Sequence, residues 1–190
     1  MGKEKTVLYI NACVRSESRT ERIAKALLGK SGGIIEEVKL TEIDLQPLSE
    51  EKLRKRTQLI EERDYSDKMF DLAKQFQKAD EIVISAPYWD FSFPALLKLY
   101  LENIYVTGLV SEYTETGEPH GLCNAKKLFF VTTAGGTYLP DFSYTYLRFL
   151  AQTCFGIPET ELIKAEMLDI DGFDAEAITE AKIEEIQNSI

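Results

Sequence analysis

The sequence has very little histidine and few cysteines. His120 is the only histidine and lies in a loop rich in glycine and proline. A histidine-centred metal site is therefore excluded, and a Ser-His-Asp triad would depend on this one residue. The three cysteines, Cys13, Cys123 and Cys154, are widely spaced and include no C-x2-C pair, which favours reduced thiols. No metal site is expected, and His120 is assigned no chemistry.

The sequence is also short of positive charge and of long apolar runs. It has 22 Lys and Arg against 32 Asp and Glu, which gives a net charge of -10 and a pI near 4.8. This balance argues against nucleic acid, because such binding depends on basic side chains that neutralise phosphates. No apolar run is long enough for a membrane span, and the first one is too short for a signal sequence. We expect a cytoplasmic protein with no membrane or nucleic-acid partner.

What the sequence does contain is a regular alternation of strand and helix patterns. The length of 190 residues suits a single domain covering residues 1–190. Short apolar runs predict strands at residues 6–11, 34–40, 81–85, 127–133 and 161–165. Helical spacing predicts helices at 20–30, from Asp67 to 76, from 94 toward 108, at 143–155 and at 174–190, with a surface helix at 49–63.

This alternation predicts an α/β fold with a doubly wound parallel sheet between two helical layers. Ile82, Val83 and Ile84 are apolar without alternation, which is typical of a strand buried on both faces. Short right-handed crossovers are compatible with the flavodoxin-like strand order 2-1-3-4-5. In that order the loops after the first and third strands flank one crevice, where ligands bind.

Three loops at the carboxyl ends of these strands carry the candidate site. The first supplies hydroxyl groups, positive charge and the free N–H groups of a helix start, which suit a phosphate. The second supplies aromatic rings, and the third a Gly-Gly pair that lets a backbone approach a flat ring. The candidate binding residues are Ser18, Arg19 and Thr20, then Pro87, Tyr88, Trp89, Asp90 and Phe91, and then Thr133, Ala134, Gly135 and Gly136.

Four stretches together resemble one family, the FMN-dependent NADH-azoreductases and quinone reductases of flavodoxin-like fold. They are Ser18 to Thr20, Ala86 to Phe91, Tyr113 to Leu122, and Thr132 to Gly136. The resemblance implies that the first holds the FMN phosphate. It further implies that Pro87 to Phe91 follow the ring and ribityl chain, and that Thr133 to Gly136 border the pyrimidine side.

The resemblance also implies an activity. NADH or NADPH would reduce FMN at N5 and leave, and a quinone, azo or nitro compound would then take the electrons in a ping-pong reaction. The flavin carries this chemistry, so no catalytic side chain is named. Such proteins are homodimers, which predicts a homodimer here. The sequence departs from the family at Asp90, where Asn is common, and at Ala134, where several members carry a longer polar side chain.

Two other functions remain open at this point. Cys13 and Arg19 have the C-x5-R spacing of low-molecular-weight phosphatases and arsenate reductases, in which a thiolate of lowered pKa attacks phosphorus. A flavodoxin-like electron carrier without direct NAD(P)H use would suit the acidic composition. Against a carrier stands the segment from Gly108 to Ala125, which in the resembling reductases helps to shape a substrate site.

Overall fold

The sheet of this protein has five parallel strands, as the alternation of patterns predicts. The computed structural model describes residues 4–189. The strand order is β2-β1-β3-β6-β7, which confirms the predicted order 2-1-3-4-5. The strands are β1 (Thr6–Asn11), β2 (Ile34–Lys39), β3 (Glu81–Ser85), β6 (Lys127–Thr133) and β7 (Glu159–Ala165). The strand order reverses between β1 and β3, which are hydrogen-bonded neighbours.

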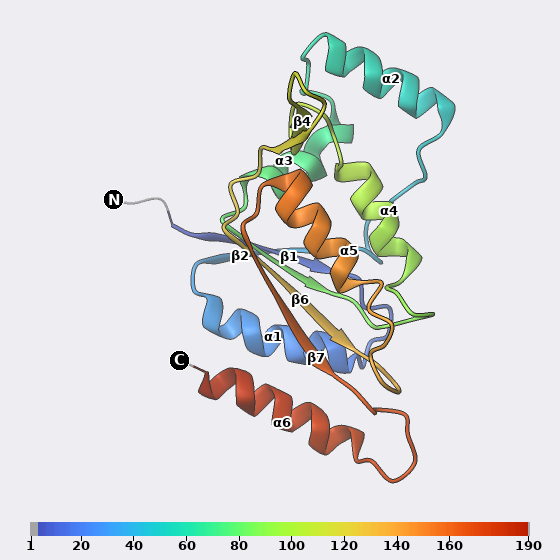
Figure 1. Ribbon diagram of the computed structural model, residues 1–190, viewed down its shortest axis with the longest axis vertical. Helices are drawn as coiled ribbons and strands as arrows, with labels where there is room; N and C mark the ends of the chain where they lie inside the picture. Colours follow the sequence, from blue (N-terminus) through green and yellow to red (C-terminus); the bar gives the residue numbers. More distant parts are fainter. Residues whose placement is uncertain (1–3, 190) are drawn as a thin grey trace.

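Helices cover both faces of this sheet (Figure 1). On one face lie α1 (Arg19–Ser31) and α6 (Ala175–Asn188), and on the other lie α3 (Asp71–Lys78), α4 (Ala95–Ile104) and α5 (Tyr144–Phe149). The surface helix α2 (Glu50–Glu61) stands out from the body of the molecule and buries no residue. The three-layer arrangement is confirmed. No helix within residues 4–189 is long and apolar enough to cross a membrane.

The apolar core divides into two clusters, one on each face of the sheet. Strand β3 contributes to both, because Ile82 and Ile84 belong to the cluster under α3 and α4, and Val83 belongs to the cluster under α1. All three side chains are fully buried. The lack of alternation in this strand thus reflects burial on both faces.

Side chains at the helix starts explain where several helices begin. Ser18, Ser49 and Asp174 each accept a hydrogen bond from a backbone N–H in the first turn of the following helix. Asp67 caps the short 3-10 helix η1 (Lys68–Phe70), which leads into α3. The helix predicted at 143–155 is divided, because α5 changes at Leu150 into the π-helix η2 (Leu150–Phe155).

The segment between α4 and β6 forms a small hairpin that the sequence patterns do not reveal. Its strands are β4 (Ser111–Tyr113) and β5 (Pro119–Gly121). Gly121 packs directly on η2, where an added Cβ would lie 2.0 Å from the backbone N of Gly156. The backbone N–H of Asn124 donates to the Gln77 carbonyl of α3 at 2.9 Å, and in Figure 1 β4 lies away from the carboxyl ends of the sheet strands. The structure therefore places the segment from Gly108 to Ala125 away from the crevice of its own chain.

Candidate functional site

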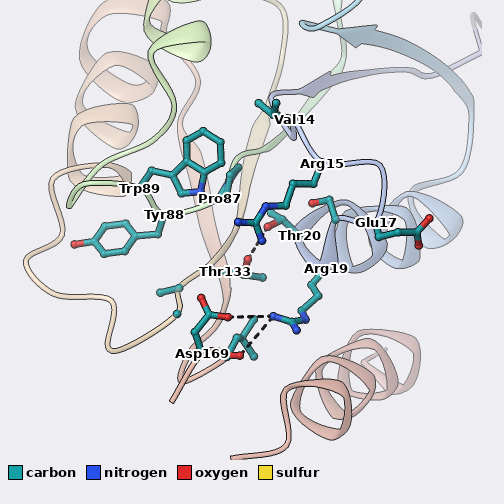
Figure 2. A pocket seen from close by; sticks show the side chains of 14 residues that line it. Val14, Arg15, Glu17, Arg19, Thr20, Pro87, Tyr88, Trp89, Thr133 and Asp169 are labelled. Atoms are coloured by element: carbon teal, nitrogen blue, oxygen red, sulfur yellow. Dashed lines mark hydrogen bonds and ion pairs between the residues drawn. The ribbon is translucent and has the colours of Figure 1, made fainter. Parts of the chain in front are cut away.

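A crevice of about 240 Å³ lies where the loops after β1, β3, β6 and β7 meet (Figure 2). It occupies the switch point between β1 and β3, as the strand order predicts. Nine of the twelve candidate residues line it: Ser18, Arg19, Thr20, Pro87, Tyr88, Trp89, Thr133, Ala134 and Gly135. The crevice thus brings together three loops that are far apart in the sequence.

The loop after β1 presents hydrogen-bond donors to one end of the crevice. Ser18 accepts a hydrogen bond of 3.2 Å from the backbone N–H of Glu21, which fixes the start of α1. The N–H groups of Arg19 and Thr20 precede the first intrahelical bonds and donate to no acceptor in residues 4–189. Thr20 is buried and shares a hydrogen bond of 2.6 Å with the Thr133 hydroxyl. This end of the crevice suits an anion.

The two arginines of this loop take different directions. Figure 2 shows Arg15 extending into the crevice between Pro87 and Thr20. Arg19 instead reaches the opposite rim, where its guanidinium lies 3.4 Å from Asp169 Oδ1 and 3.5 Å from the Leu168 carbonyl oxygen. Arg15 is outside the predicted binding set, yet it lines the crevice more directly than Arg19 does.

The aromatic loop after β3 forms the other end. The backbone N–H of Tyr88 donates to the Thr133 carbonyl at 2.9 Å, and the Tyr88 hydroxyl donates to the Pro140 carbonyl at 2.6 Å. Trp89 is 40% exposed and lines the crevice beside Tyr88. Tyr88 is thereby held against the end of β6 and the loop after it, and a ligand ring could contact both aromatic side chains.

Asp90 and Phe91 lie beyond the crevice lining, at the tip of a tight turn. Trp89 and Ser92 exchange two backbone hydrogen bonds of 2.8 and 2.9 Å, which close the turn. Between them Asp90 and Phe91 have φ angles of 49° and 64°, a conformation that favours glycine. Their roles in binding stay predictions, and so does that of Gly136, which is also outside the lining.

The loop after β7 is the part of the site that sequence reasoning missed. Leu168 and Asp169 line the crevice from this loop, and Val14 and Glu17 complete the lining. The Asp169 backbone N–H donates to the Gly135 carbonyl at 2.9 Å, and a Cβ on Gly135 would lie 2.5 Å from the Asp169 carboxylate. The two loops therefore lie close together at Gly135, and a side chain there would displace the Asp169 carboxylate. No motif in the sequence signals that pairing.

The environment of Cys13 argues against phosphatase chemistry. Its side chain is only 2% exposed and its Sγ lies 3.5 Å from the Ser85 hydroxyl. Burial raises the pKa of the Cys13 thiol, and hydrogen bonds with Ser18 and Ser85 oppose this shift without reversing it. A phosphatase needs the opposite shift and an accessible thiolate. The structure therefore does not support the phosphatase hypothesis.

Comparison with known proteins agrees with this geometry. Residues 5–190 match a family described as having a flavodoxin-like fold. The chain is 34% identical over 187 residues to an FMN-dependent NADH:quinone oxidoreductase of Coprothermobacter proteolyticus, with 90% of each chain covered. It is 33% identical over 188 residues to an enzyme of the same name from Clostridium perfringens, with 94% of each covered.

Solved structures show the same fold. An FMN-dependent NADH-azoreductase from Bacillus anthracis, solved in complex with FMN, superposes with a TM-score of 0.79. The two chains are 22% identical, and 96% of each is covered. An NAD(P)H:quinone oxidoreductase from Methanothermobacter marburgensis superposes with a TM-score of 0.65 at 16% identity, covering 98% of this chain and 99% of its own.

Proposed function

This chain belongs to the family of flavodoxin-like fold that includes FMN-dependent NADH:quinone oxidoreductases, and we infer that its crevice is an FMN site. The protein is an oxidoreductase that uses FMN and NADH to reduce quinones or azo compounds. The observation that carries the assignment of the site is the crevice itself, with an anion-binding end and an aromatic end at the switch point.

The donor set of the crevice fits FMN. The free N–H groups of Arg19 and Thr20, the Ser18 hydroxyl and the Arg15 guanidinium would hold the phosphate. Tyr88 and Trp89 would contact the flat ring system.

The backbone at the other side of the crevice would meet the polar edge of the ring. The backbone N–H of Ala134 donates to the Ala165 carbonyl at 2.9 Å, so it is not available to the ring. Gly135 carries no side chain, so its backbone would be open to close contact with the ring.

FMN supplies the redox chemistry by accepting hydride from NADH and passing electrons to the acceptor. The protein orients both partners and leaves one side of the site open. Trp89 remains 40% exposed, so the aromatic end of the crevice is accessible to a second flat molecule. Asp90 is exposed at the tip of the neighbouring turn, where it can influence the choice of acceptor.

The decisive experiment is anaerobic reduction of the FMN-loaded protein. We expect NADH to bleach the visible flavin band directly and a quinone to restore it. A protein that holds FMN but is reduced only by a separate reductase would instead be an electron carrier. Failure to bind FMN, together with phosphatase activity lost in Cys13→Ser, would overturn the assignment.

We also propose that the protein is a homodimer. Several large apolar side chains are exposed in the single chain, which is typical of an association surface. They are Phe91 (59%), Leu139 (69%), Phe142 (64%) and Phe149 (56%). Sedimentation equilibrium should give twice the chain mass, and Leu139→Asp with Phe142→Asp should give the monomer. A monomeric wild-type protein would refute this proposal.

We further propose a cytoplasmic location. NADH is a cytoplasmic reductant, and Cys13, Cys123 and Cys154 are all free thiols, as is usual in that compartment. Cell fractionation with an antibody to the protein tests this, and recovery outside the cytoplasmic fraction would contradict it.

A further inference from the structure

A buried amide lies beneath the loop that forms the anion-binding end of the crevice. Asn11 is the last residue of β1, and its side chain is fully buried. Its Oδ1 accepts a hydrogen bond of 3.0 Å from the backbone N–H of Cys13 and one of 3.4 Å from the Ser85 hydroxyl. The Asn11 side chain therefore sets the first bend of the chain after β1.

A carboxylate on the neighbouring strand holds the NH2 end of this amide. Asn11 Nδ2 donates a hydrogen bond of 3.0 Å to Glu37 Oε1 on β2. A carboxylate only accepts hydrogen bonds, so it requires the NH2 group of the amide to face it. The backbone N–H of Cys13 can only donate, so it requires the amide oxygen, and the contacts at the two ends of the amide select the same orientation. Glu37 itself does not line the crevice.

The loop has few other contacts that could determine its course. Val14 to Glu17 are exposed, and no hydrogen bond joins them to another segment of residues 4–189. The loop is held at its start, where Ala12 N–H donates to the Ser85 carbonyl at 2.8 Å and Cys13 N–H donates to Asn11. It is held at its end by the Ser18 cap of α1.

We propose that Glu37, acting through Asn11, is a positioning residue for the phosphate-binding loop. This proposal rests on the function proposed above, because it takes the phosphate of FMN as the group that the loop receives. Glu37 holds the Asn11 amide in one orientation, and the amide oxygen holds the first turn of the loop. The N–H groups and Arg15 that follow are thereby aimed at the crevice.

Two variants of Glu37 separate positioning from charge. Glu37→Met and Glu37→Gln both remove the negative charge, but only the glutamine keeps an oxygen that accepts from Asn11 Nδ2. A simple charge effect predicts that both variants bind the FMN dianion equally well or more tightly than the wild type. Positioning predicts that only Glu37→Met binds FMN more weakly.

The experiment is a titration of the apoprotein with FMN, in which the quenching of flavin fluorescence measures binding. We expect Glu37→Met to raise the Kd roughly two- to tenfold, the range of one net hydrogen bond, and Glu37→Gln to leave it unchanged or lowered. Glu36→Met is the matched control, because Glu36 lies on the same strand and accepts from Gln75 rather than from Asn11. It should not raise the Kd.

The outcomes are distinguishable. If the wild type binds FMN and Glu37→Met binds it as tightly as Glu37→Gln, the positioning role is refuted while the FMN site stands. If Glu36→Met weakens binding as much as Glu37→Met, the effect belongs to the strand in general and the proposal also fails. If the wild type binds no FMN, the proposed function fails first.

Discussion

At the scale of single residues, the charge that meets the phosphate depends on which arginine points inward. Arg15 and Arg19 are in the same loop, and the family resemblance of Ser18 to Thr20 favoured Arg19. The structure pairs Arg19 with Asp169 at the rim and directs Arg15 into the crevice. Arg15 forms no ion pair with a carboxylate of residues 4–189, whereas Arg19 would have to leave Asp169 to bind an anion.

We expect Arg15→Ala to weaken FMN binding by about 1.5 kcal/mol or more, the scale of a hydrogen bond to a charged group. Arg19→Ala should cost less, since the bound anion competes with Asp169 for this guanidinium. Titrations with FMN and with riboflavin measure both effects. Riboflavin has no phosphate, so its affinity should not change in Arg15→Ala. A larger loss in Arg19→Ala would show that Arg19 turns inward when FMN binds.

At the scale of elements, the turn from Trp89 to Ser92 is held in a costly conformation. A residue with a Cβ in the left-handed region costs roughly 1–2 kcal/mol, and this turn has two of them in succession. Phe91 is 59% exposed, so burial of its ring within the chain does not offset that cost. Strain of this kind is concentrated at functional sites.

Phe91→Gly should accordingly stabilise the fold by roughly 0.5–1 kcal/mol in urea unfolding, because glycine adopts positive φ without steric cost. Phe91→Ala is the matched control, since alanine loses the ring but keeps the strain. It should not be more stable than the wild type. If the Phe91 ring contacts the electron acceptor or the partner subunit, both variants should lose quinone reductase activity equally. Equal stability of the two variants would mean that the turn is not strained.

Besides backbone hydrogen bonds, a carboxylate joins the loop after β7 to the loop after β6. Glu166 accepts from the Tyr138 backbone N–H at 2.6 Å and from Lys164 at 2.6 Å. Burial alone raises the pKa of Glu166, but these two bonds together outweigh it and hold the pKa below its usual value. A carboxyl with a lowered folded-state pKa stabilises the fold above its unfolded pKa, and this contribution is lost as pH falls through the folded pKa.

Glu166→Gln should therefore destabilise the protein at neutral pH by about 1 kcal/mol, the scale of its hydrogen bonds. The difference from the wild type should shrink below about pH 4.3, where a free Glu becomes protonated. Urea unfolding at both pH values measures it. A difference that does not change with pH would show that the charge of Glu166 contributes nothing.

At the scale of the whole molecule, the crevice joins segments that are distant in sequence. It collects loops after four of the five sheet strands, from Val14 to Asp169. A ligand bound there contacts the native fold only, so it must stabilise the whole folded unit. If residues 1–190 form one domain, as the sequence predicts, the protein unfolds in a single transition, and ligand binding raises the temperature of that whole transition.

We expect FMN at about a hundred times its Kd to add about 2.7 kcal/mol, which corresponds to a Tm increase of roughly 5–10 °C for a chain of this size. Differential scanning calorimetry measures it. Riboflavin at the same concentration should shift the Tm less, because it cannot use the loop after β1. Equal shifts would argue that this loop binds no phosphate, and two separate transitions would contradict the single domain.

The fold and most of the crevice follow from local patterns in the amino-acid sequence. Buried parallel strands require continuous apolar runs, so β1, β3 and β6 could be located to the residue. The strand order then brings the loops after β1 and β3 together at one edge. Ser18, Tyr88 and Gly135 could be selected because each lies in a loop of distinctive composition directly after a strand.

The contacts between loops, in contrast, depend on the folded chain. Asp169 lines the crevice because the backbone of its loop is hydrogen-bonded to Gly135. Arg19 points to the rim, where its guanidinium donates a hydrogen bond to the Asp169 carboxylate. Glu37 reaches the loop after β1 through Asn11 from another strand. These contacts join residues far apart in the chain through specific hydrogen-bond geometry. They leave no periodic pattern in the sequence, because they depend on distances that exist only after the sheet has formed.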